Sequence, residues 1–374
     1  MNKKSETQIS LVDSIKQTGF ILEHQVATML EEKGWAVIHT RYYLDDVISQ
    51  QREIDMVAYK VQIKDDFRLV TALIISCKKS DLYDWIFLTR KAPAMNYNLN
   101  LFPVTFSSNI DEFNYEVKLV NWNEELKTQS DSLPQLIRKL NQYDETIFAF
   151  KEFKTDSLKG RSDSSIFDSI SSLIKAQSYE IKSLKNRRKT TEKYIYNFNL
   201  LSISDVIFKK VLFDKENITE TTIDRINYIN RFLINNEEQY SRIDFITFKK
   251  LKNAIDDYDS LHQLNLQFWD TLENRFYDNV WDVSRINDII EKNGNKFLSQ
   301  VKSKIYESKL INDSDFKSLE FDKKENNLII DCYCSSKSNE YLNTKPHIQS
   351  FTKSWLKKIF RYEGSFTYED IFPF

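Results

Sequence analysis

Glycine, proline and cysteine are all scarce in this chain of 374 residues, which contains five glycines, five prolines and three cysteines. No two glycines are close enough to build the glycine-rich loop that holds the phosphates of a nucleotide, so nucleotide-driven chemistry on such a loop is not expected. Three cysteines cannot cross-link a chain of this length, which excludes a small disulfide-stabilised module and indicates reduced thiols.

The chain also lacks an excess of charge of either sign and a long apolar run. Its 53 Lys and Arg against 55 Asp and Glu give a net charge of −2, so any contact with nucleic acid must use a local patch. The first ten residues lack the apolar core of a signal peptide. The longest apolar stretch, Leu69 to Cys77, is less than half of the ~20 residues that a membrane helix needs. We therefore expect a cytoplasmic protein without a membrane-spanning segment.

The residues that build a core are plentiful. Hydrophobic residues make up 41% of the sequence and aromatic residues 14%, enough for one large domain or two, and this composition argues against disorder. The patterns predict an α/β fold, with a mixed central sheet flanked by helices. A change of character near residue 259 predicts a first domain at 1–258, with a less regular insertion at about 81–160, and a mainly helical region with a β-hairpin at 259–374.

The start of the chain predicts one helix and three strands. Apolar residues recur at helical spacing after Thr18, a candidate cap, and stop at Gly34. In the second strand, alternation places Asp55 and Val57 on one face and Ile54 on the other. The predicted strands lie at 35–43, 53–61 and 69–78.

The rest of the chain alternates between both kinds of element. Within the insertion, the patterns predict a short strand at 115–120 and a helix at 133–143. The following predictions are a helix at 165–184, strands at 194–203, 206–213, 222–233 and 242–246, and a helix at 248–258. Beyond the boundary they are helices at 261–277 and 283–311, a hairpin at 316–334 and a last helix at 346–361.

A few side chains in the first part of the chain form a candidate site. Asp55 lies on the second predicted strand, the third strand ends in Ser76-Cys77-Lys78, and Glu23 lies on the preceding helix. Hydrolysis of a phosphodiester needs such a set. Carboxylates bind Mg²⁺, which prefers oxygen ligands. The metal generates a nucleophile from water, and a lysine stabilises the attacking hydroxide or the developing charge.

These residues, in this order, resemble the PD-(D/E)xK nuclease superfamily, which includes many restriction enzymes and Holliday-junction resolvases. The resemblance implies a restriction-endonuclease-like fold in which Glu23, Asp55 and the backbone carbonyl of Cys77 bind Mg²⁺ or Mn²⁺, and Lys78 is the catalytic lysine. It also implies a metal-dependent DNA endonuclease in a prokaryotic defence role. The balanced net charge favours a partner protein or a homodimer that delivers the substrate. The matching segments are residues 19–23, 52–58 and 74–80.

The sequence departs from the family motif at Ser76, because the family has a carboxylate two residues before the lysine. A serine hydroxyl is neutral and a poor ligand for Mg²⁺, so this difference weakens metal binding. Either Glu53 or Glu23 supplies the missing charge, or the site is degenerate, by evolution or by deliberate substitution. The alternative function is therefore a catalytically inactive nuclease-fold subunit that binds nucleic acid or serves as a scaffold. The sequence does not separate DNA from RNA as the target.

Each candidate residue also has an ordinary interpretation. A single Asp on a strand is usually a solvated or turn-forming residue, Lys-Lys after an apolar strand usually marks its exit into solvent, and an isolated helical Glu usually faces solvent. The four histidines are scattered and show no spacing typical of a zinc site. It is the order of the residues on successive elements that favours a site.

Overall fold

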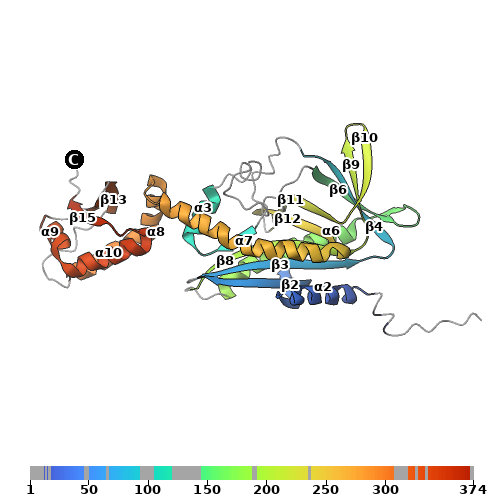
Figure 1. Cartoon of the computed structure of the whole chain (residues 1–374), viewed down its shortest axis with the longest axis horizontal. Helices are drawn as coiled ribbons and strands as arrows, with labels where there is room; N and C mark the ends of the chain where they lie inside the picture. The colour runs from blue at the N-terminus through green and yellow to red at the C-terminus, as the bar shows by residue number, and fades with distance from the viewer. Residues whose placement is uncertain are drawn as a thin grey trace, which may run out of the picture. The chain divides into compact units, whose positions relative to one another are not determined.

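A computed structural model of the chain describes residues 12, 15, 18–45, 50–64, 67–92, 105–119, 145–187, 192–234, 237–306, 319–324, 327–332 and 336–370. The chain forms two compact units, residues 1–271 and 272–374, and Figure 1 labels most of their elements. The division lies inside helix α7 (Leu251–Asp278), which runs without a break past residue 259. The two separate helices predicted at 248–258 and 261–277 are therefore one helix.

The first unit is built on a mixed β-sheet. Its strands follow the order β1 (Ala36–Asp45), β2 (Gln50–Lys64), β3 (Phe67–Lys79), β8 (Lys193–Asp205), β12 (Glu237–Thr247) and β11 (Arg225–Ile234), with β5 (Thr105–Ser108) also beside β8. β3, β8 and β12 are parallel neighbours, whereas β2 is antiparallel to both β1 and β3. The unbroken apolar run of β3 is buried on both faces, as expected for a central strand.

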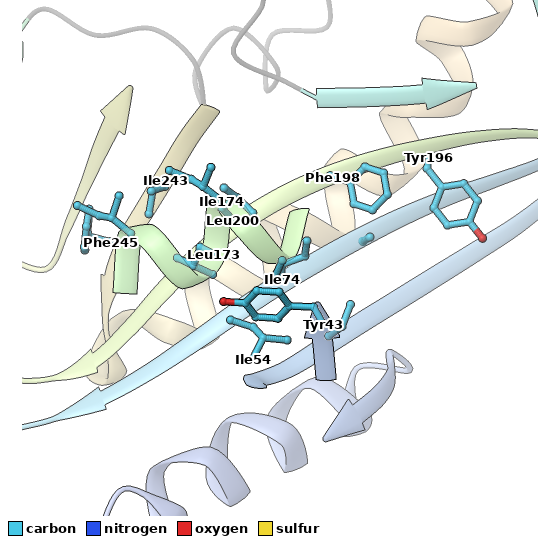
Figure 2. Close-up of a cluster of buried hydrophobic side chains, with 14 of the residues drawn as sticks. Tyr43, Ile54, Ile74, Leu173, Ile174, Tyr196, Phe198, Leu200, Ile243 and Phe245 are labelled. Carbon is cyan, nitrogen blue, oxygen red and sulfur yellow. The ribbon is translucent and has the colours of Figure 1, made fainter. Parts of the chain in front are cut away.

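Helices cover both faces of this sheet. Ile74 of β3 is buried together with Leu173 and Ile174 of helix α6 (Ser164–Arg187) on one face, as Figure 2 shows. Thr71, which points to the other face, is hydrogen-bonded to His262 of α7. Helix α2 (Phe20–Glu32) also packs on β1, β2 and β3. The α/β class with a mixed sheet flanked by helices is confirmed. Within the described ranges, no helix is both long and apolar enough to cross a membrane.

A second sheet continues from the first. Its order is β10 (Asn217–Ile223), β9 (Phe208–Asp214), β4 (Tyr83–Lys91), β6 (Glu145–Lys154) and β7 (Gly160–Arg161). β3 leads directly into β4, and β8 leads into β9, so the two parallel pairs follow one another along the chain. The described part of the predicted insertion thus supplies β4, β6 and β7 to a regular sheet.

The strand predicted at 115–120 is wrong, because residues Asp111–Leu119 form helix α3. Asp111 and Glu112 lie in its first turn and Lys118 in its last, an arrangement that favours the helix dipole at both ends. The helix predicted at 133–143 lies outside the described residues.

The second unit is a small α/β layer. Its elements are the end of α7, α8 (Val283–Tyr306), β13 (Leu319–Lys324), β14 (Asn327–Cys332), α9 (Ser336–Thr344), α10 (Pro346–Phe360) and β15 (Ser365–Asp370). β13 and β14 form the predicted hairpin, and β15 adds a parallel strand that the sequence did not predict. Aromatic rings fill its core, with Phe297 and Trp355 at 4.2 Å and Trp281 stacked on Phe360 at 5.1 Å between centroids.

The contact between α7 and the main sheet is polar at its centre. The Thr71 hydroxyl and Nδ1 of His262 are hydrogen-bonded at 2.8 Å. Both side chains are buried, as are those of Asn197 and Asn265. Nδ2 of Asn265 donates to Thr71 and to Asn197 of β8, at 3.3 Å each. These hydrogen bonds tie α7 to β3 and β8, although Oδ1 of Asn265 and Nδ2 of Asn197 have no hydrogen-bond partner among the described residues.

The titration of His262 gives a measurable consequence of this burial. Burial, with a contribution from Lys60, lowers the pKa of His262 to about 4 from its ordinary value of 6.5. As the pH falls from 6.5 towards 4, the unfolded chain takes up the proton first, so stability is lost in this window. Between pH 7 and pH 4.5, the free energy of unfolding measured with urea should fall by about 2 kcal/mol less in His262→Asn than in the parent protein. Equal losses would show that His262 is not held neutral.

Candidate functional site

Strand β2 changes face at Asp55. Arg41 of β1 reaches Glu180 of α6, with a distance of 3.1 Å between Nε and Oε1. Ile54 is the register partner of Arg41, and it is buried in the same core as Val57 beneath α6. Strict alternation would put Ile54 and Val57 on opposite faces. Asp55 therefore points away from α6, to the face that carries α2, and the prediction that it shares a face with Val57 is wrong.

The change of face has its cause at Thr40, the residue of β1 that lies opposite Asp55. The register pairs His39–Met56 and Arg41–Ile54 flank this position, where no pair forms. Thr40 has a φ of 52°, in the left-handed region that β-branched residues avoid. Such a conformation costs about 1–2 kcal/mol. Sequence reasoning missed Thr40, because nothing in a threonine within a strand pattern signals a positive φ.

The carboxylate of Asp55 closes the end of the β2–β3 ladder. The register pairs between these strands stop at Met56–Ile75. Beyond that pair, the backbone amide of Cys77 donates to Oδ2 of Asp55 at 2.5 Å, so a side chain replaces the next backbone acceptor. Hydrogen bonds to charged groups contribute about 1.5–3 kcal/mol. This contact fixes Asp55 beside the backbone of the Ser76-Cys77-Lys78 segment.

Glu23 lies in the first turn of α2, close to three other charges. Burial raises the pKa of Glu23, and the negative charges of Asp55 and Glu53 raise it further, whereas Lys78 lowers it. The buried thiol of Cys77 has its pKa raised by burial and then by Asp55 and Glu23. These effects place Glu53, Asp55 and Lys78 within electrostatic range of Glu23. We call these four residues the acidic cluster.

Ser76 lies outside the acidic cluster. It is 1% exposed, and its register partner on β8 is Ser202. Oγ of Ser169 on α6 donates to Oγ of Ser202 at 2.8 Å, which places Ser202 and Ser76 on the α6 face, opposite Asp55. The buried Ser76 Oγ has no hydrogen-bond partner in the described part of the chain. The side chain of Ser76 therefore points away from the acidic cluster, to the opposite face of the sheet.

The oxygen atoms at the cluster suit a hard divalent cation, although they are few. Among the described residues, no three His, Cys, Asp or Glu side chains are close enough to hold a metal ion. The candidate ligands are the carboxylates of Glu23 and Asp55 and the carbonyl of Cys77, and one oxygen of Asp55 already accepts a hydrogen bond. Mg²⁺ commonly uses one or two carboxylates and keeps several waters. The residues fit such a weak, water-rich site.

The chain matches no protein-family model, no curated protein and no solved structure. The resemblance to PD-(D/E)xK nucleases therefore rests on the residues of α2, β2 and β3 and on their arrangement. Function is accordingly inferred from the contacts, burial and charge of this chain.

Replacing Glu23 tests whether its charge destabilises the fold. Because the pKa of Glu23 is raised, the folded state loses stability as the pH rises from 4.5 through the raised pKa. We expect Glu23→Gln to raise the melting temperature by up to about 2 °C at pH 8 without divalent ions, and to change it little at pH 4. Glu31→Gln, at an exposed position of the same helix, is the control. A lower melting temperature for Glu23→Gln at pH 8 would contradict this account.

Two substitutions at Ser76 test the face on which it lies. Ser76→Ala removes a hydroxyl without a partner, so the free energy of unfolding should change by less than about 1 kcal/mol. Ser76→Glu forces a carboxylate into the interface with α6 and should cost about 3 kcal/mol or more. Urea unfolding measures both. A stable Ser76→Glu protein that gains stability from Mn²⁺ would show that position 76 reaches the acidic cluster.

Proposed function

We propose that the protein is a metal-dependent nuclease that hydrolyses phosphodiester bonds in DNA with Mg²⁺ or Mn²⁺. The acidic cluster is the observation that carries this proposal. Three carboxylates and one lysine lie within electrostatic range of one another near the point where β2 and β3 stop pairing. Burial and then the negative charges of Asp55 and Glu53 raise the pKa of Glu23. Charges arranged against stability are typical of functional sites. A bound divalent cation would offset the repulsion.

The order of elements around the cluster supports the PD-(D/E)xK resemblance. Helix α2 is followed by β1, by β2 with Asp55 and by β3 with Lys78. After the intervening elements β4, β5, α3, β6 and β7, helix α6 leads to β8, which is parallel to β3 in the same sheet. This is the succession that the resemblance implies, and a restriction-endonuclease-like fold is part of the proposal.

In this proposal, Glu23, Asp55 and the carbonyl of Cys77 would hold the ion. When bound, a divalent ion supplies a Lewis acid and lowers the pKa of a coordinated water. The hydrogen bond from the Cys77 amide holds one oxygen of Asp55 and leaves the other for the site. Lys78 would stabilise the negative charge that develops on the phosphate. Glu53, which is exposed, would supply the charge that Ser76 lacks.

The setting of this activity follows from charge and from the resemblance. A net charge of −2 provides no general attraction for DNA. This supports delivery of the substrate by a partner protein or by a homodimer, in the cytoplasm. A role in defence against foreign DNA comes from the resemblance alone.

A catalytically inactive nuclease-fold subunit is the second candidate, and the position of Ser76 favours it. The residue two positions before Lys78 is buried on the α6 face, so neither serine nor a simple reversion to a carboxylate would contribute a ligand there. The fold would then serve to bind nucleic acid or to hold a partner.

Cleavage of supercoiled plasmid DNA with Mg²⁺ or Mn²⁺ tests the proposal. We expect nicking by the parent protein and by Glu31→Gln, and a loss of about 100-fold or more in Asp55→Asn and Lys78→Ala, because charge stabilisation in the transition state is removed. An RNA substrate is assayed in parallel, to separate the two nucleic acids.

Calorimetry with Mn²⁺ separates the enzyme from the inactive subunit. Heat of binding that vanishes in Asp55→Asn supports a metal site at the acidic cluster. Absence of both cleavage and Mn²⁺ binding in the parent protein would overturn the nuclease proposal and leave the second candidate.

A further inference from the structure

We propose that two exposed aromatic rings beside the acidic cluster, Phe20 and Tyr42, stack on unpaired bases, so that single-stranded DNA is the preferred substrate. This inference rests on the proposed nuclease function and names the class of its substrate. It rests on the positions of the two rings, on their exposure and on the charged side chains next to them.

Tyr42 lies on the same face of the sheet as the acidic cluster. Its neighbours on β1 both turn to α6, Arg41 through Glu180 and Tyr43 through the ring of Tyr179. Tyr42 therefore points to the opposite face. Its register partner is Glu53, and directly paired residues have Cβ atoms roughly 5 Å apart. The side chain of Tyr42 is 50% exposed, so its ring presents an open surface beside a carboxylate of the cluster.

Phe20 is the second exposed ring next to a residue of the cluster. It is the first residue of α2 and precedes Glu23 by three positions, and residues with this spacing are neighbours on a helix surface. Phe20 is 69% exposed, although it lies one turn from a half-buried carboxylate. Phe20 is thus a neighbour of Glu23 on the helix, and Tyr42 is a neighbour of Glu53 on the sheet.

The concentration of exposed rings at this point is unusual for the chain. Of the described aromatic side chains, four are exposed, and two of them adjoin the acidic cluster. The four are Phe20, Tyr42, Phe148 and Phe167. A single exposed apolar side chain needs no explanation. Here, however, both rings are neighbours of carboxylates that belong to the same cluster. Because both rings are exposed, burial of apolar surface does not explain their positions.

Single-stranded DNA is the ligand that uses such rings. In a duplex the faces of the bases are covered by neighbouring base pairs, whereas an unpaired base offers a free face. Stacking of a base on an aromatic side chain contributes about 1–3 kcal/mol and is tolerant of sequence. Bases stacked on Phe20 and Tyr42 would place the phosphates between them at the acidic cluster, where a divalent cation and Lys78 would meet their charge.

Fluorescence anisotropy with labelled oligothymidine, and with the duplex that it forms with oligoadenosine, tests the proposal. Ca²⁺, which also takes oxygen ligands, replaces Mg²⁺ to limit cleavage during the measurement. We expect the single strand to bind more tightly than the duplex. Phe20→Ala and Tyr42→Ala should each weaken strand binding roughly fivefold or more, with duplex binding unchanged. All three positions are exposed, so Phe148→Ala, on β6, serves as the matched control and should bind as the parent does.

The inference and the proposed function fail in different ways. Equal binding of strand and duplex, or an equal effect of Phe148→Ala, would overturn the stacking proposal, even if plasmid cleavage is observed. A partner protein would then be the occupant of these rings. Conversely, strand binding that is lost only in Phe20→Ala and Tyr42→Ala, in a parent protein that neither cleaves DNA nor binds Mn²⁺, would retain the stacking rings and overturn the nuclease.

Discussion

The hydrogen bond from the Cys77 amide to the Asp55 carboxylate is the contact on which the candidate site depends. It forms where the backbone ladder between β2 and β3 stops. A carboxylate in this position is held by the sheet itself, so it needs no mobile loop to bring it near Glu23. The same contact ties the Asp55 side chain to the segment that carries Lys78. The sheet therefore sets the distance between Asp55 and this segment.

This arrangement opposes the stability of the fold at two points. Thr40 adopts a positive φ opposite Asp55, and Glu23 is half-buried beside two like charges. Backbone strain and opposed charges at one place are typical of sites kept for binding or chemistry. The opposite face of the sheet is covered by a continuous apolar core, in which Ile54, Ile74 and Leu173 pack together (Figure 2). That core holds the strands in place while their other face carries the charges.

The elements that sequence predicts well are those with a single dominant signal. Helix α2 ends before Gly34, which has a φ of 78°, as a glycine stop predicts. The apolar run of β3 forms a central strand, because both of its faces are covered. In contrast, the predicted break at residue 259 is absent, since Tyr258 and Leu261 are both buried on one continuous helix that packs on the sheet.

The residues of the candidate site could be chosen from the sequence, but the face of the sheet on which each of them lies could not. The order of Glu23, Asp55 and Lys78 along helix and strands predicted that they would meet, and Asp55 and Lys78 both act electrostatically on Glu23 in the structure. Period-two alternation could not show that β1 and β2 change face at Thr40 and Asp55. It therefore could not show that Ser76 and Asp55 lie on opposite faces, nor that Tyr42 lies beside Glu53.

The most direct test of this account is a crystal of the protein soaked in Mn²⁺ and measured at the manganese absorption edge. The account predicts an anomalous peak bounded by the carboxylates of Glu23 and Asp55 and the carbonyl of Cys77, with Ser76 turned to α6. A crystal without a peak at this place, or with one on the α6 face beside Ser76, would contradict it.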